Sequence, residues 1–341
     1  MQKTILLVTG ATGYVGGSVL SQLLSRSDVD SFEFRAIVRS AEKAEKLKAF
    51  GVFPILGSHS DEDVMVEAAS EADIVLLMAD SDNVKSIEVT LLGLKKRYES
   101  TGKAPVLINT SGTGMLADDA IGMYSSDVIW DDASPEQLEN LPPTAPHRPV
   151  DLRILAADKE GYIKSYIIAP SAIYSISRNP LVVAGISNSH NRLWSFLIPI
   201  SLVRGQGGMV GEGKNIWPNV HIDELVILYD LLLDSILKNP TTTSHGREGI
   251  FFAHSDEYKF YDVYKRIAEV LFKLGKGRSP EPTPFEEDEL KRLMIANYLG
   301  CNSRCRSSNA TRLGWKPVKT TNDFLDSIEA EVKHQLVGRM A

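Results

Sequence analysis

The chain has 341 residues, 43% of them hydrophobic and 24% charged, and is long enough to bury the core of one large domain or of two unequal ones. Its formal net charge of −7 at pH 7 argues against a nucleic-acid-binding surface, because phosphate binding needs clustered Lys and Arg. No apolar run reaches the ~18 residues of a membrane span, and no charged and apolar leader precedes the first expected strand, so we expect a cytoplasmic protein with no membrane partner.

The first expected elements are a strand, a glycine-rich turn and a helix. An apolar run from Thr4 ends in Thr9-Gly10, and an amphipathic run of helical period follows without a gap. Gly10 permits the tight turn, Gly13 lets backbone N–H groups approach a pyrophosphate, and Gly16 lets the helix pack closely on the strand. The unpaired N–H groups and the helix dipole then supply an anion site. The stretch therefore predicts dinucleotide binding.

A second strand over residues 32–39 ends in Arg39, and a helix over residues 41–50 follows it. An acidic residue at this strand end would bind a ribose 2′-hydroxyl, whereas an arginine pairs with a 2′-phosphate. No Asp or Glu stands there, and Ser40 and Lys43 lie close behind Arg39. The pattern favours NADP(H) over NAD(H). The alternative is that Arg39 is a surface residue that ends the strand.

Strands and helices continue to alternate through the first half. Strands are expected over residues 52–57, 72–79 and 105–110, with helices opening near Ser60 and over residues 83–98, capped by Ser60 and Asp82. Such alternation implies right-handed crossovers and one twisted parallel sheet, hence an α/β, doubly wound fold. Ala79 and Asp80 stand at the carboxyl end of a strand, where a dinucleotide passes in sheets of this type.

The segment Thr9 to Gly16, TGATGYVG, resembles the cofactor fingerprint of the extended and atypical short-chain dehydrogenase/reductase superfamily. That superfamily also includes nucleotide-sugar epimerases and NmrA-type redox-sensing regulators. The segments 169–175, 217–225 and 312–317 resemble later motifs of the same superfamily, so the resemblance extends over nearly the whole chain.

The resemblance implies a Rossmann core over residues 1–175, with its sheet completed by segments around 209–255. It also implies a smaller C-terminal α+β lobe over residues 176–341 that binds substrate and interleaves with the core. The cofactor contacts it implies are Gly10, Thr12, Gly13, Tyr14, Val15, Gly16, Ser111, Pro170, Ser171 and Ile173. Asp223 is expected to cap a helix from residue 224, which gives it an architectural role with His221.

The expected catalytic residues lie directly after the fifth strand and on the helix that comes next. Ser111 stands where relatives place the serine that binds the reacting carbonyl, and Thr113 offers a second hydroxyl; the alternative is that both form the turn around Gly112. Relatives carry Tyr-x-x-x-Lys on the following helix, where a lysine lowers the pKa of the phenol. In this chain only Tyr261 and Lys265 have that spacing, and they stand far beyond the nucleotide core.

His147 and Asp151 fall at the positions of the missing pair, four residues apart. They suggest a histidine base with an orienting carboxylate. The alternative makes His147 a loop residue and Asp151 a residue that favours the first turn of a helix. Tyr124 is a further hydroxyl that could fold over the nicotinamide. The two cysteines, Cys301 and Cys305, have no second Cys or His pair nearby, so we expect reduced thiols and no metal.

These patterns predict an NADP(H)-dependent oxidoreductase that acts on a small or medium-sized carbonyl or alcohol compound. An isomerase or epimerase of the same fold remains an alternative, as does a sensor that binds NADP(H) without turnover. The expected partner is a small-molecule substrate and not a nucleic acid. The oligomeric state stays open, with a homodimer as one candidate.

Overall fold

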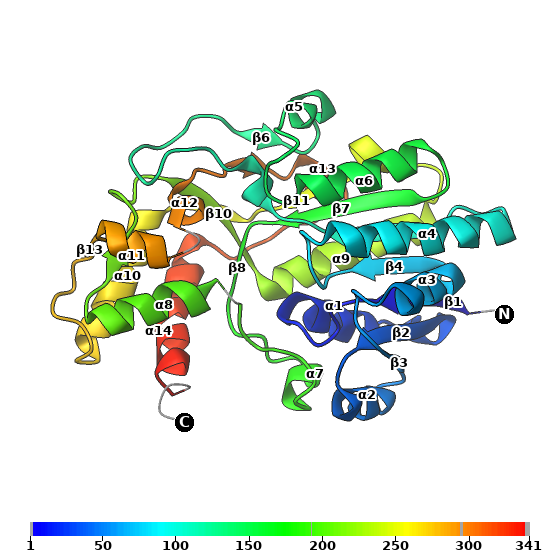
Figure 1. Ribbon diagram of the computed structural model, residues 1–341, viewed down its shortest axis with the longest axis horizontal. Coiled ribbons are helices and arrows are strands. Elements are labelled where there is room, and N and C mark those ends of the chain that lie inside the picture. The colour runs from blue at the N-terminus through cyan, green and yellow to red at the C-terminus, as the bar shows by residue number, and fades with distance from the viewer. Residues whose placement is uncertain (1–2, 192, 294–295, 338–341) are drawn as a thin grey trace.

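Seven parallel strands form the main sheet of the protein. The computed structural model describes residues 3–191, 193–293 and 296–337. The strands are β1 (Thr4–Val8), β2 (Phe32–Val38), β3 (Phe53–Leu56), β4 (Ile74–Leu77), β5 (Val106–Thr110), β7 (Lys164–Pro170) and β11 (Ile250–Ala253). Their order across the sheet is β11-β7-β5-β4-β1-β2-β3, and every neighbouring pair is parallel (Figure 1).

Helices cover both faces of this sheet. One layer contains α1 (Tyr14–Leu24), α2 (Ala41–Lys48) and α9 (Ile222–Lys238), and the other contains α3 (Glu62–Glu71), α4 (Val84–Thr101) and α6 (Arg148–Lys159). Side chains alternate along a strand, so Leu6 and Val8 of β1 pack into the first layer while Leu7 packs into the second. The predicted doubly wound, Rossmann-type α/β fold is therefore confirmed.

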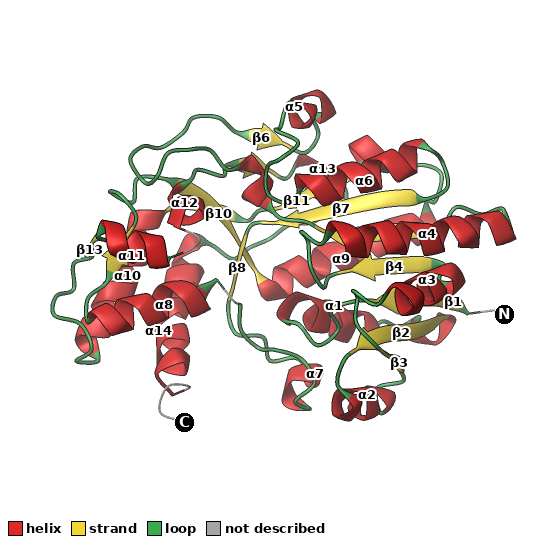
Figure 2. Cartoon of the chain, in the orientation of Figure 1, coloured by secondary structure: helices red, strands yellow, loops and turns green. Residues whose placement is uncertain are grey.

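A smaller lobe follows the main sheet and has a core of its own. It contains a three-stranded sheet of β8 (Ala172–Tyr174), β10 (Ile216–His221) and β12 (Asp256–Lys259). The helices α8 (Trp194–Arg204), α10 (Phe260–Lys273) and α14 (Thr321–Val337) pack against it (Figure 2). None of the helices in the described ranges is long and apolar enough to cross a bilayer.

Short elements complete the chain. Two pairs of two-residue strands join distant segments: β6 (Trp130–Asp131) with β14 (Cys305–Arg306), and β9 (Gly208–Met209) with β13 (Thr283–Pro284). The remaining helices are α5 (Pro135–Glu139), α7 (Pro180–Val183), α11 (Glu287–Arg292), α12 (Ala296–Gly300) and α13 (Ser308–Arg312).

Several local predictions are wrong. The apolar pattern of residues 161–174 suggests one strand, but the chain is interrupted at Ser171, so β7 lies in the main sheet and β8 in the smaller one. The mostly apolar stretch over residues 186–203 suggests one helix, but α8 begins only at Trp194. The glycine-containing segment 209–215 suggests a hairpin, but its first residue, Met209, instead belongs to the β9–β13 pair. Of the segments expected to complete the main sheet, β11 does so, whereas β10 lies in the smaller sheet.

The helix caps also differ from the prediction. Asp61 rather than Ser60 precedes α3, and the Oδ1 atom of Asn83 accepts from the Ser86 N–H at 2.9 Å at the start of α4. At α9, the Nδ1 atom of His221 accepts from the Asp223 N–H, so His221 is the cap. Asp82 is consequently available for another contact.

Candidate active site

The glycine turn has the geometry that its sequence predicts. Gly10 has a φ of +74°, and a Cβ there would lie 2.5 Å from the carbonyl oxygen of Met78. A Cβ on Gly16 would lie 2.3 Å from the carbonyl oxygen of Gly10, so only glycine allows α1 to approach the turn this closely. Gly13 precedes α1 and has no side-chain cap, which leaves the first N–H groups of the helix for another acceptor.

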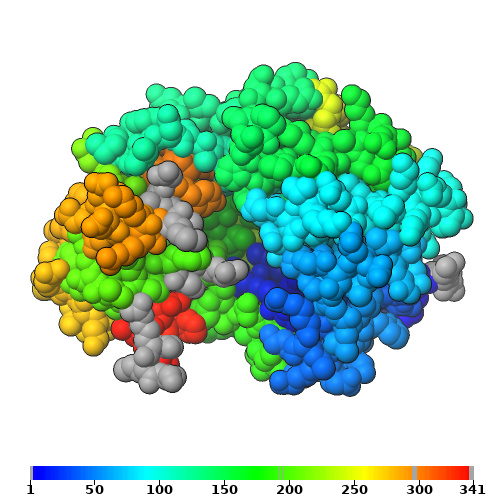
Figure 3. Space-filling view, in the orientation of Figure 1, coloured from blue at the N-terminus to red at the C-terminus, as the bar shows by residue number. Residues whose placement is uncertain are grey.

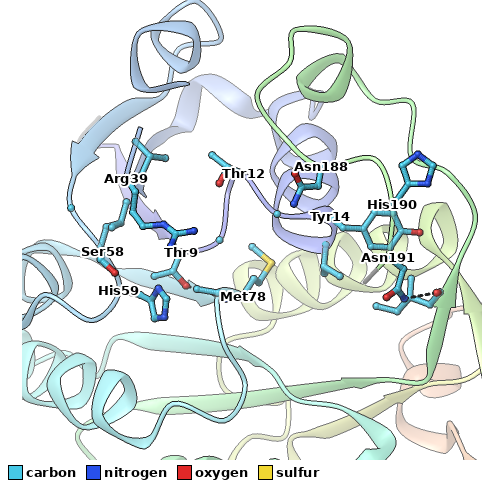
Figure 4. A pocket seen from close by; sticks show the side chains of 18 residues that line it. Thr9, Thr12, Tyr14, Arg39, Ser58, His59, Met78, Asn188, His190 and Asn191 are labelled. Carbon is cyan, nitrogen blue, oxygen red and sulfur yellow. Dashed lines mark hydrogen bonds between the residues drawn. The ribbon is translucent and has the colours of Figure 1, made fainter. Parts of the chain in front are cut away.

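A cavity of about 370 Å³ lies over this turn (Figure 4). Arg39, Ser58 and His59 line one end of it, and Asn188, His190 and Asn191 line the other. The predicted contact residues that line it are Gly10, Thr12, Gly13, Tyr14, Val15, Arg39, Ala79 and Ile173. Gly16 acts behind the turn through its packing, and Asp80 accepts the N–H of Asp82 at 3.0 Å. Sequence reasoning missed Ser58 and His59, which carry no recognisable pattern.

A second cavity, of about 790 Å³, shares the lining residues Val15, Ile173 and Asn191 with the first, so the two cavities adjoin there. Figure 3 shows the molecule hollowed between the blue and cyan N-terminal half and the orange and green C-terminal lobe. The polar lining of the second cavity includes Ser81, Asp82, Thr110, Ser111, Thr113, His147, Ser171 and Ser303. Its apolar lining includes Pro146, Pro170, Ala172, Leu193, Phe196, Trp217 and Tyr298.

Ser111 is held by a buried carboxylate. Its Oγ atom donates to Oδ2 of Asp151 at 2.8 Å, and the Asn109 amide donates to the other oxygen at 3.3 Å. Asp151 is 1% exposed, and burial raises its carboxyl pKa to about 6. At neutral pH the Ser111 proton therefore points to Asp151, and the oxygen lone pairs are what this hydroxyl can offer to the cavity.

His147 pairs with a different carboxylate from the one that sequence spacing suggests. Its Nδ1 atom lies 3.0 Å from Oδ1 of Asp82 and 3.1 Å from Oγ of Ser81, and its backbone N–H donates to the same Asp82 oxygen. The prediction that Asp151 orients His147 is thus wrong. The i, i+4 argument requires two helical residues, and His147 precedes α6 with a φ of +67°.

The other predicted hydroxyls divide between the cavity and the surface. Thr113 lines the second cavity, and its carbonyl oxygen accepts from Ser303 Oγ at 2.6 Å. Tyr124 is 45% exposed, and its hydroxyl donates to Asp119 at 2.8 Å; it is not among the described residues that line either cavity. Tyr261 and Lys265 lie on α10, where both bind Glu281.

Metal chemistry has no candidate site in the described part of the chain. No group of three or more His, Cys, Asp or Glu side chains there could hold an ion. Both cysteine thiols are free and buried, and burial raises their pKa values.

Comparison with known proteins agrees with the fold and with the glycine turn. Residues 1–91 match the sequence model of the NmrA-like family. Oxidase ucsJ of Acremonium sp is 28% identical over 92% of both chains. A 4-hydroxy-2-methyl-3-oxo-4-farnesyl-3,4-dihydroquinoline-1-oxide ketoreductase of Stigmatella aurantiaca is 30% identical over 33% of this chain and 34% of its own.

Solved structures of low identity share the fold over nearly the full length. A UDP-glucose 4-epimerase of Thermotoga maritima superposes with a TM-score of 0.63 and 16% identity, covering 99% of this chain and 100% of its own. A dTDP-glucose 4,6-dehydratase of Bacillus anthracis in complex with NAD has a TM-score of 0.63 and 14% identity, covering 97% and 96%. The resemblance predicted from the sequence is confirmed by the NmrA-like match and by this shared fold.

Proposed function

We propose that the protein is an NADP(H)-dependent oxidoreductase that interconverts a carbonyl and an alcohol in a small or medium-sized substrate. The observation that carries the proposal is that the two cavities adjoin at Val15, Ile173 and Asn191. A cavity built on a dinucleotide-type turn borders there on one that is lined by His147 and Ser111. The names of two relatives, an oxidase and a ketoreductase, support redox chemistry.

The first cavity fits a dinucleotide. Side chains at Gly10 and Gly16 would close the turn, and the amides that open α1 suit a pyrophosphate. Structures of the same fold hold NAD, so the preference for NADP(H) rests on Arg39. That side chain is exposed at the cavity end, and within the described ranges it makes no ion pair that would compete with a 2′-phosphate.

The second cavity fits a proton transfer beside a hydride transfer. When bound, the nicotinamide would supply hydride to the carbonyl carbon. His147 would give its Nε2 proton to the carbonyl oxygen during reduction and take it back during oxidation. Ser111, whose proton is directed to Asp151, would accept a hydrogen bond from the alcohol. The apolar side chains of Leu193, Phe196 and Trp217 would exclude water from the far side.

A nicotinamide fluorescence titration followed by a panel of carbonyl compounds tests the proposal. We expect tight NADPH binding and oxidation of NADPH by at least one compound of the panel. We also expect that His147→Ala lowers turnover about 100-fold without changing NADPH affinity. Tight binding with no oxidation across the panel would instead favour a cofactor-binding sensor. A changed substrate with no net NADPH consumption would favour an isomerase or epimerase.

A further inference from the structure

We propose that Asp82 positions His147 so that Nε2 faces the reacting oxygen, and that the Tyr298 hydroxyl is a second hydrogen-bond donor at the same point. This inference rests on the proposed function and gives Asp82 and Tyr298 roles that the sequence pattern did not. Asp82 follows β4, His147 precedes α6, and Tyr298 lies on α12, so three separate segments would build the proton-transfer site.

The contact between Asp82 and His147 fixes the ring in two ways. One carboxylate oxygen, Oδ1, receives both the ring Nδ1 and the backbone N–H of His147, each at 3.0 Å. The hydrogen bond from His147 lowers the pKa of the Asp82 carboxyl, so the carboxylate is ionised at neutral pH. An ionised acceptor at Nδ1 retains a proton there, which leaves the lone pair of the neutral imidazole on Nε2.

The Nε2 atom points to the glycines that follow β5. A Cβ on Gly112 would lie 2.8 Å from it, and a Cβ on Gly114 would lie 3.1 Å from it. The described residues provide no hydrogen-bond partner for Nε2, although His147 lines the second cavity. A side chain at Gly112 or Gly114 would crowd the imidazole, so the glycines allow the His147 ring to pack this closely against the turn after β5 while it lines the second cavity.

Tyr298 reaches the same space from the C-terminal lobe. Its hydroxyl would lie 2.7 Å from the Cβ of a residue at position 114, and its ring packs edge-on against Trp217 with centroids 4.8 Å apart. Burial raises the pKa of the Tyr298 phenol, so the hydroxyl keeps its proton and acts as a donor. His147 and Tyr298 therefore approach Gly114 together, and both line the second cavity, so one small substrate group in that cavity would meet both Nε2 and the phenol.

The reaction balances with these groups. In reduction, the carbonyl carbon takes the hydride that reduced nicotinamide supplies, and the C=O π electrons move to the oxygen. The oxygen then takes the proton from the Nε2–H bond of imidazolium, while the Nδ1 proton stays on the ring against Asp82. Tyr298 donates a hydrogen bond to the developing oxyanion and keeps its own proton. Water returns a proton to His147 after product release.

The test of Asp82 uses a readout that does not depend on turnover. In protein labelled with 15N-histidine, the His147 signals, assigned with His147→Gln, should show the neutral ring protonated at Nδ1. Asp82→Ala should lose this preference and lower kcat about 100-fold, with the KM for the carbonyl compound and the NADPH Kd within twofold of wild type. Asp82→Asn keeps an acceptor oxygen and should retain the tautomer, with an intermediate kcat.

Glu88→Gln is the matched control, because it removes a carboxylate charge from α4 while its amide oxygen can still accept from Arg153 of α6, and Glu88 lines neither cavity. It should leave both the tautomer and kcat unchanged. An unchanged tautomer in Asp82→Ala would overturn the positioning role even if no substrate were found. A loss of kcat in parallel with NADPH affinity would reduce Asp82 to a structural residue.

Tyr298→Phe tests the second donor, because it keeps the ring against Trp217 and removes only the hydroxyl. We expect kcat to fall about 10-fold with the His147 tautomer unchanged. Wild-type kcat and KM in this variant would remove Tyr298 from the proposal.

Discussion

The buried carboxylate of Asp151 gives a prediction that stability measurements can test. Burial raises its pKa from 3.8 to about 6, so the folded protein holds this proton more tightly than the unfolded chain does. The stabilisation that this bound proton gives the folded state is fully present below the pKa of the unfolded chain. It is lost as pH rises through the pKa of the folded protein. Since a shift of one pKa unit corresponds to 1.36 kcal/mol, the free energy of unfolding falls by about 3 kcal/mol in total. About 1.4 kcal/mol of this loss occurs between pH 5 and pH 8.

Asp151→Asn removes the ionisation while the amide oxygen can still accept from Ser111. The free energy of unfolding is measured in urea by tryptophan fluorescence at pH 5 and pH 8. Between these pH values wild type should lose about 1.4 kcal/mol more stability than Asp151→Asn does. Ser111→Ala is the opposite control, because removing the hydrogen bond that lowers the Asp151 pKa should make the pH dependence steeper. The same pH dependence in Asp151→Asn and wild type would refute this reasoning, whatever the constant offset between them.

Three further substitutions test the cavities. Gly16→Ala brings a Cβ to 2.3 Å from the backbone oxygen of Gly10, so we expect NADPH affinity by fluorescence to fall at least about 10-fold with the circular dichroism spectrum retained; unchanged affinity would contradict the packing argument. Arg39→Ala should raise the NADPH Kd about 10-fold and the NADH Kd less than twofold, and equal weakening would rule out 2′-phosphate recognition there. Gly114→Ala places a methyl group 2.7 Å from the Tyr298 hydroxyl and 3.1 Å from His147 Nε2, so these side chains must shift and turnover should fall more than 10-fold at constant NADPH affinity; wild-type turnover would contradict a role for their arrangement.

Local sequence rules predicted the nucleotide half of the fold well. The three glycines of the turn have steric requirements that depend on neighbours within a few residues or on the adjacent strand, and strand-helix alternation determines a parallel sheet. The prediction for Asp82 was wrong because Asp and Asn both cap helices, and here the next residue, Asn83, caps α4.

The second cavity depends on contacts that no local rule contains. The distance between His147 and Asp151 follows helical spacing only if both residues are helical, and His147 has a left-handed backbone. Tyr298 comes from a lobe whose position over Gly114 depends on the packing of Trp217 and the segments around it. Contacts between segments this far apart in the sequence can be identified only in the folded structure.

The hydroxyl of Tyr14 has a consequence for any attempt to divide the protein. Tyr14 is the first residue of α1 and is 8% exposed. Its hydroxyl donates to the carbonyl oxygens of Tyr174 and Ser175, and the Tyr174 ring packs against Phe324 of α14. A fragment ending near residue 175 would keep both acceptors of Tyr14 but would lose Phe324, so the Tyr174 ring that adjoins them would be left without its packing partner. The nucleotide-binding half should therefore express poorly by itself, and useful truncations would have to spare the C-terminal helix.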